Sequence, residues 1–443
     1  MSSSAAGRAG QPPKSAPLIS TLFFLAPLAT AVAPRLAPFF LPIIGLVLIV
    51  GALRRRVAWR ELVQPNTALI GLVSVALYAI LSATWAADQS EAVTKGAMLL
   101  GITFLVFAAT AALATLDERQ VRRASIAFLV GASLAAIFVT IELLTDGAVT
   151  RAAMNSISLL KPERAKHVKM SKGLVTKMNL SEFNQNVAML SLQLWPGLLA
   201  LRAVEAGARR IVLMILFFLL VAVPIAISEH DSSQVALIVS LLVLPLARRW
   251  PRPTVRGLAI AWCLGFVLVL PLDFLSYKAE LYRASWLPSS ARARIIIWEY
   301  TAERTLDHPW LGIGADSTAA VKAQRVTQPE KPKGYVIRRT TGQHAHDLFL
   351  QAWYELGLFG VILLAIAGAA MVLRIPLLPR EAQPFAAACF TTFVTIAAFA
   401  WGIWQVWLMC AVALMPLYMA MAAARFRTPR EELPPDGTTP ASL

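Results

Sequence analysis

The dominant feature of the chain is a series of apolar blocks separated by short polar connectors. Each block is about 17–25 residues long, which is the length of a helix that crosses the hydrocarbon core of a bilayer. A helix is expected because it satisfies its own backbone hydrogen bonds inside lipid. The pattern predicts an all-α integral membrane protein with about twelve transmembrane helices, at residues 18–34, 37–53, 66–86, 94–115, 124–145, 184–201, 211–228, 233–248, 257–275, 348–373, 385–401 and 405–424.

The basic residues alternate between connectors and so predict the topology. Every second connector is rich in arginine, beginning with Arg54, Arg55 and Arg56, while the short connectors between them hold few basic residues. By the positive-inside rule the arginine-rich connectors face the cytoplasm, together with both termini. The predicted divisions are a cytoplasmic tail at 1–17, helices at 18–146, a basic loop at 147–183, helices at 184–275, a large loop at 276–347, helices at 348–424 and a disordered cytoplasmic tail at 425–443.

Composition narrows the class of protein further. Of the 443 residues, 57% are apolar and 15% are charged, which excludes a cytosolic enzyme and a disordered chain. The three cysteines lie in apolar blocks and form neither a disulfide framework nor a metal spacing. Ala31-Val32-Ala33 resembles a signal-peptidase site, but the next apolar block follows almost at once, which favours a retained helical hairpin.

The net charge of +16 is larger than topology alone requires. Both long loops carry more basic than acidic residues, and the first is rich in lysine, including Lys169 and Lys172. Positive charge on the non-cytoplasmic side indicates an anionic ligand. General attraction to the anionic head groups of membrane lipids would explain the same charges.

The second loop contains a predicted amphipathic helix over residues 291–306. Ser289 or Ser290 is the expected N-cap, and Pro309 ends the helix. Arg294 lies one turn before Trp298, on the same face. Arg294 is either presented to a ligand at the membrane surface or is a solvated, snorkelling charge. The apolar residues that recur at helical spacing are Ile295, Trp298, Ala302 and Leu306.

A His-x-His pair stands directly before the next apolar helix. Asp347 is placed to cap that helix, so His346 is expected at the membrane–water boundary. Histidine is the side chain best suited to general-base chemistry near neutral pH. His344 and His346 would also suit a metal, although Zn²⁺ usually takes a third protein ligand. An interfacial histidine that only anchors the helix is a further interpretation.

The order of these motifs resembles the O-antigen ligase and polymerase superfamily. The resemblance rests on Arg294-x-x-x-Trp298, His308-Pro309-Trp310-Leu311-Gly312-Ile313-Gly314, His346-Asp347-x-x-Leu350 and Glu355-Leu356-Gly357-Leu358-Phe359-Gly360, with Asn184-x-Asn186 as a weaker match. The chain departs from the family pattern at two places. Asp347 replaces the usual asparagine, and Ser232-Ser233-Gln234 replaces a Ser-Arg pair.

The resemblance implies glycosyl transfer on the periplasmic side of a bacterial inner membrane. The implied donor is a glycan on undecaprenyl pyrophosphate, and in the ligase branch the acceptor is a sugar hydroxyl of lipid A–core. No cofactor, metal or nucleic acid is expected, and the sequence indicates no oligomeric state. His346 is the expected general base and Arg294 the group that stabilises pyrophosphate. The expected substrate-binding residues are Arg292, Arg338, Arg339, His344, Asn184, Asn186, Lys169 and Lys172.

Three alternatives stay open. Other branches of the same superfamily polymerise glycans or glycosylate proteins, and the basic outer face favours the ligase branch because lipid A–core carries phosphates. A transporter or flippase belongs to another class and would share the number of helices. Carriers usually place charges inside their helices, whereas here the polar chemistry lies in the loops.

Overall fold

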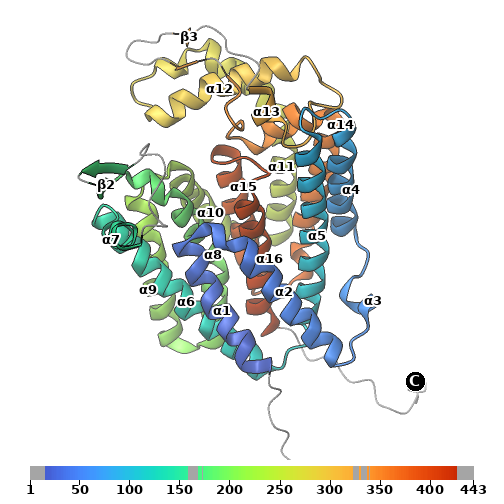
Figure 1. The fold of residues 1–443 in the computed structure, drawn as a ribbon. Helices are drawn as coiled ribbons and strands as arrows, with labels where there is room; N and C mark the ends of the chain where they lie inside the picture. Colours follow the sequence, from blue (N-terminus) through green and yellow to red (C-terminus); the bar gives the residue numbers. More distant parts are fainter. Residues whose placement is uncertain are drawn as a thin grey trace, which may run out of the picture.

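A bundle of long α-helices forms the body of the protein, and two short helices, α12 (Ser289–Thr305) and α13 (Thr318–Lys322), lie at one end of it (Figure 1). The structure, a computed structural model, describes residues 15–157, 168–171, 173–322, 329–330, 337–338 and 340–426. Within these residues ten helices are long and apolar enough to cross a membrane, and two shorter apolar helices lie at 17–32 and 383–399. The predicted all-α integral membrane class is therefore confirmed. Each of the predicted apolar blocks coincides with one of these helices.

The long helices are α1 (Ser15–Val32), α2 (Ala37–Arg54), α4 (Thr67–Leu81), α5 (Gln89–Leu113), α6 (Glu118–Leu144), α8 (Asn184–Val204), α9 (Gly207–Ile227), α10 (Asp231–Arg249), α11 (Pro251–Lys278), α14 (Leu348–Val372), α15 (Gln383–Phe399) and α16 (Val406–Ala424). The short helices are α3 (Trp59–Leu62), α7 (Ala148–Ser156), α12 (Ser289–Thr305) and α13 (Thr318–Lys322). Two antiparallel strand pairs are β1 (Val168–Ser171) with β2 (Leu174–Met178) and β3 (Pro329–Glu330) with β4 (Ile337–Arg338).

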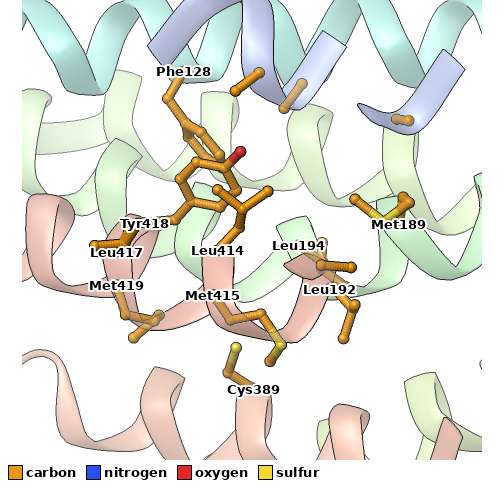
Figure 2. Close-up of a cluster of buried hydrophobic side chains, with 14 of the residues drawn as sticks. Phe128, Met189, Leu192, Leu194, Cys389, Leu414, Met415, Leu417, Tyr418 and Met419 are labelled. Carbon is orange, nitrogen blue, oxygen red and sulfur yellow. The ribbon is translucent and has the colours of Figure 1, made fainter. Parts of the chain in front are cut away.

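Helices α8 and α16 form the centre of the bundle. Both are apolar around most of their circumference, and they pack against each other. Figure 2 shows their side chains meeting Phe128 of α6 and Cys389 of α15. The ring of Tyr418 lies 4.6 Å from the ring of Phe128, centroid to centroid. A helix buried on all sides packs against other helices, so α8 and α16 hold the surrounding helices in place.

The arginine-rich connectors meet at one end of the bundle. Arg55, after α2, donates to the hydroxyl of Thr115, which precedes α6, at 2.6 Å. Arg425, after α16, forms an ion pair with Glu118 at the start of α6. Helix α12 lies at the opposite end (Figure 1). This separation is the one that the charge pattern predicts, and the assignment of either end to the cytoplasm stays a prediction.

The helix predicted in the second loop exists, but two of its details are wrong. Ser289 and Ser290 are its first residues rather than its N-cap, since Pro288 precedes the helix and Ser290 donates instead to Asp231 at 3.3 Å. Leu306 is 60% exposed because the helix ends at Thr305. The buried face packs against α11 and α14, so protein covers it.

The first loop contains helix α7 and the β1–β2 hairpin. Helix α7 and the β1–β2 hairpin are joined by Asn155, whose amide donates to the carbonyl of Val175 and accepts from its N–H. Lys169 of β1 lies directly opposite Lys177 of β2, and both side chains are exposed. The predicted disordered tail at 425–443 lies outside the described residues from position 427 onward.

A candidate active site at one end of the bundle

The geometry of His346 fixes which of its nitrogens is free to act as a base. Its Nδ1 lies 2.5 Å from the carbonyl oxygen of Ala400. A carbonyl can only accept a hydrogen bond, so Nδ1 carries the proton and Nε2 carries the lone pair. Burial and the positive charge of Arg294 lower the pKa of His346 below its ordinary value, although the bond to Ala400 opposes this. The imidazole is therefore neutral near pH 7.

The backbone of His346 is held in an unusual conformation. Its φ is +58°, in the left-handed region that side chains other than glycine rarely adopt. Hydrogen bonds made by its two neighbours in the chain, Ala345 and Asp347, hold this conformation. The indole N–H of Trp298 donates to the carbonyl of Ala345 at 2.9 Å. The carboxylate of Asp347 accepts from the N–H groups of Phe349 and Leu350, which confirms its predicted role as the cap of α14.

Arg294 brings a positive charge to the same place from α12. Its side chain is half-buried, and burial lowers its pKa although the carboxylate of Asp231 opposes this. Burial, together with the charge of Arg294, lowers the pKa of His230 to about 3. The guanidinium is thus near enough to two imidazoles, His230 and His346, to affect both. The structure therefore brings Arg294 and His346, which the sequence predicts as site residues, close enough to interact electrostatically.

His344 shares the site with His346. Their ring centroids are 4.1 Å apart, with the planes inclined at 46°. The backbone of Gly402 passes so close to His344 that an added Cβ would lie 2.8 Å from the histidine Cβ. Within the described residues no group of three His, Cys, Asp or Glu side chains has metal-ligand geometry. The alternative of a metal held by His344 and His346 therefore has no third protein ligand in this part of the chain.

The connector between α15 and α16, residues 400–405, contacts the histidines of the site and two polar residues of α14. Ala400 binds His346, and the ring of Trp401 stacks on His230 with centroids 4.8 Å apart. The N–H of Ile403 donates to Gln351 of α14 at 3.1 Å, and the indole of Trp404 donates to Glu355. Ala400 and Trp401 fall inside the predicted helix at 385–401, which ends at Phe399 in the structure, and none of these residues belongs to a motif. The only signal for them in the sequence is two tryptophans beside a glycine.

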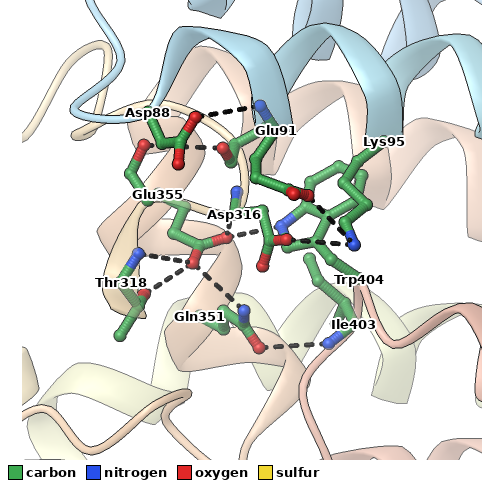
Figure 3. Close-up of polar contacts among 11 residues, drawn as sticks. Asp88, Glu91, Lys95, Asp316, Thr318, Gln351, Glu355, Ile403 and Trp404 are labelled. Carbon is green, nitrogen blue, oxygen red and sulfur yellow. Dashed lines mark hydrogen bonds and ion pairs between the residues drawn. The ribbon is translucent and has the colours of Figure 1, made fainter. Parts of the chain in front are cut away.

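Glu355 is the hub of a buried polar network beneath the site (Figure 3). Its side chain is fully buried, and its two oxygens accept five hydrogen bonds. The donors come from α14, from the segment that leads into α13 and from the 400–405 connector. They are the N–H of Asp316, the N–H and hydroxyl of Thr318, the amide of Gln351 and the indole of Trp404.

A glycine-dependent contact joins the turn at 309–314 to α14. Gly357 interrupts α14 with φ +62°, and a Cβ there would lie 2.4 Å from the carbonyl of Trp310. Gly312 and Gly314 also have positive φ, as a tight irregular turn requires. The N–H of Gly314 donates to the carbonyl of Glu355 at 2.9 Å. The turn is thus bound to the kink through backbone contacts that larger residues would prevent.

The remaining predicted site residues are spread more widely. Arg292 is half-buried in α12, two residues before Arg294, and Arg338 belongs to β4. Asn184 opens α8, and the amide of Asn186 donates to the carbonyls of Ala31 and Val32 at 2.8 Å each. These two hydrogen bonds join α8 to the end of α1. Lys169 lies on the β1–β2 hairpin, while Arg339 and Lys172 lie outside the described residues.

These features define a class of protein. It is an integral membrane protein with a half-buried arginine–histidine site where loop segments meet the ends of its helices. Residues 214–365, which contain Arg294 and His346, match the family model described as O-antigen ligase.

Two curated relatives carry the same kind of name. The chain is 25% identical over 252 residues to a "Putative polysaccharide ligase" of Rickettsia conorii, which covers 54% of this chain and 58% of that protein. It is 25% identical over 266 residues to one of Rickettsia felis, covering 57% of this chain and 61% of that protein. The chain thus spans about three fifths of the length of these relatives. Together the family match and the relatives support an O-antigen ligase-type protein.

Proposed function

We propose that this protein is a periplasmic glycosyltransferase of the bacterial inner membrane. It transfers an O-antigen glycan from undecaprenyl pyrophosphate to a sugar hydroxyl of lipid A–core. The observation that carries the proposal is the pairing of a neutral imidazole, with its Nε2 lone pair free, and the half-buried guanidinium of Arg294. A base and an anion-stabilising group are the two functions that such a transfer requires.

Each group has one task in the reaction. Nε2 of His346 removes the proton of the acceptor hydroxyl as its oxygen attacks the anomeric carbon. The bond from that carbon to the pyrophosphate oxygen breaks, and the leaving group keeps the electron pair. Arg294 stabilises the new negative charge, because the planar guanidinium can bind two phosphate oxygens. A single displacement of this kind inverts the anomeric centre, and NMR of the product that showed retention would contradict this step.

The donor already carries its activation in the sugar–pyrophosphate bond, so the reaction needs neither ATP nor a resident metal. Arginine replaces the divalent cation that many soluble glycosyltransferases use. Transfer by the purified protein should therefore persist in EDTA. Activity that EDTA abolished and Mg²⁺ restored would contradict the metal-independent mechanism.

The test of the function is His346→Ala in the host strain, at matched membrane levels. Lipopolysaccharide is separated on a gel, and the undecaprenyl-linked glycans are analysed in parallel. Loss of the ladder with accumulation of long glycans on undecaprenyl is expected of a ligase. Accumulation of single repeat units would indicate a polymerase instead. An unchanged ladder would refute the catalytic role of His346 and would favour the alternative that the protein is a transporter.

A further inference from the structure

His230 is a buried imidazole at the proposed site that the mechanism above does not use. It stands directly before α10 and is 3% exposed. One face of its ring stacks on Trp401, and its Nδ1 lies 2.6 Å from the hydroxyl oxygen of Ser233. Its Nε2 is buried and has no hydrogen-bond partner among the described residues. A buried polar atom without a partner is costly and indicates a ligand.

The partner of Nδ1 determines what Nε2 can bind. Ser233 is fully buried, and within the described residues its hydroxyl has no hydrogen-bond partner other than His230. If the hydroxyl donates to Nδ1, both groups are satisfied and the ring proton is on Nε2. If Nδ1 donates instead, the serine proton and the Nε2 lone pair are both left without partners. The first arrangement leaves fewer unsatisfied groups, so Nε2–H is a buried donor.

The charges around this donor select the ligand. The guanidinium of Arg294 acts on both His230 and His346, so the donor lies beside the cation assigned to the leaving group. The carboxylate of Asp231 balances part of that positive charge and is bonded by Ser290. An oxygen acceptor that also carries negative charge satisfies Nε2–H and Arg294 together. A phosphate oxygen has both properties.

We propose that His230 is a substrate-binding residue whose Nε2–H donates to a phosphate oxygen of the undecaprenyl pyrophosphate donor, beside Arg294. The proposal rests on the proposed function for the identity of the phosphate compound. It gives the leaving group a second, neutral donor from the residue before α10 in addition to the cation from α12. Trp401 keeps the ring in place, so the 400–405 connector orients both the base and this donor.

Two substitutions separate the nitrogen that binds Ser233 from the one that binds the ligand. Asparagine at 230 retains a polar group near the position of Nδ1 but none at Nε2. Glutamine extends an amide N–H toward the position of Nε2. The matched control is Glu229→Gln, since Glu229 is the exposed neighbour of His230. The purified variants are assayed for transfer to lipid A–core, for inhibition by inorganic pyrophosphate and for binding of undecaprenyl pyrophosphate without acceptor.

His230→Asn is expected to raise the donor KM and the inhibition constant of pyrophosphate about tenfold or more, which is the range for a hydrogen bond to a charged group. The acceptor KM should stay unchanged. His230→Gln should recover most of the loss, and Glu229→Gln should match the parent. Unchanged donor KM and pyrophosphate inhibition in an active His230→Asn variant would overturn the proposal.

Should His230→Asn fail to accumulate, Ser233→Ala provides the second test. Without the serine proton on Nδ1, the ring proton is no longer fixed on Nε2, and pyrophosphate inhibition should weaken about threefold. Unchanged inhibition there would refute the proposal equally. A parent protein that bound undecaprenyl pyrophosphate through His230 but transferred nothing to lipid A–core would refute the ligase function and leave this site standing.

Discussion

Replacing Glu355 by glutamine tests whether the hydrogen bonds of this buried carboxylate stabilise the segments that support the site. The substitution keeps the shape of the side chain but exchanges one acceptor oxygen for an NH₂ group. All five partners of Glu355 are donors, with two of them on Oε2, namely the N–H of Asp316 and the indole of Trp404. Even in the better orientation, the amide therefore faces at least two donors that it cannot bind.

The cost follows from the number of donors left unpaired. A buried donor without its partner costs about 1–3 kcal/mol, so Glu355→Gln should lower the free energy of unfolding by about 2–6 kcal/mol. In detergent the unfolding temperature, followed by tryptophan fluorescence, should fall by more than about 4 °C. Transfer activity should fall as well, because Trp404 belongs to the connector that binds His346.

Glu91→Gln provides the matched control from the same cluster. The side chain of Glu91 is 48% exposed and pairs with Lys95 at 3.3 Å (Figure 3). A pair whose carboxylate is this exposed to solvent contributes about 1 kcal/mol or less. If Glu355→Gln melted within about 1 °C of the Glu91→Gln variant and kept its activity, the reasoning from buried donors would be refuted.

Two further predictions concern the base and its support. The acid limb of the pH profile of kcat should lie below pH 6.5, the ordinary pKa of histidine, because burial and Arg294 lower the pKa of His346. In the Arg294→Gln variant this limb should move to higher pH, measured on any activity that remains. A limb at pH 7 or above in the parent would contradict this. Trp298→Phe keeps the ring packing but loses the bond to Ala345, worth about 1 kcal/mol. Its kcat should fall about fivefold at matched membrane levels, and an unchanged kcat would show that this bond does not position His346.

The sequence predicts the parts of this fold that depend on local pattern. The long helices follow from the length of the apolar blocks, and the cap of α14 follows from Asp347 standing before Leu348. Gly312 and Gly314 mark their turn because tight positive-φ geometry favours glycine. The sequence does not reveal the end of α12, because Leu306 continues the apolar periodicity one residue beyond the helix.

The parts that escape the sequence depend on backbone atoms and on long-range contacts. Ala400 acts through its carbonyl and Ile403 through its N–H, and neither side chain indicates such a role. His230 is far from His346 in the chain, and only the folding of α10 beside α15 brings Trp401 onto it. Glu355 was visible as part of a motif, but its donors come from three separate segments.

The left-handed backbone of His346 connects the fold to the proposed chemistry. A non-glycine residue at φ +58° costs about 1–3 kcal/mol, and glycine would remove that cost. Glycine would also remove the imidazole, so the strain is retained where the side chain is needed. The bonds of Ala345 to Trp298 and of His346 to Ala400 hold the ring in one orientation. A base fixed in this way needs little reorganisation when the acceptor arrives, which is how a preorganised site lowers the barrier.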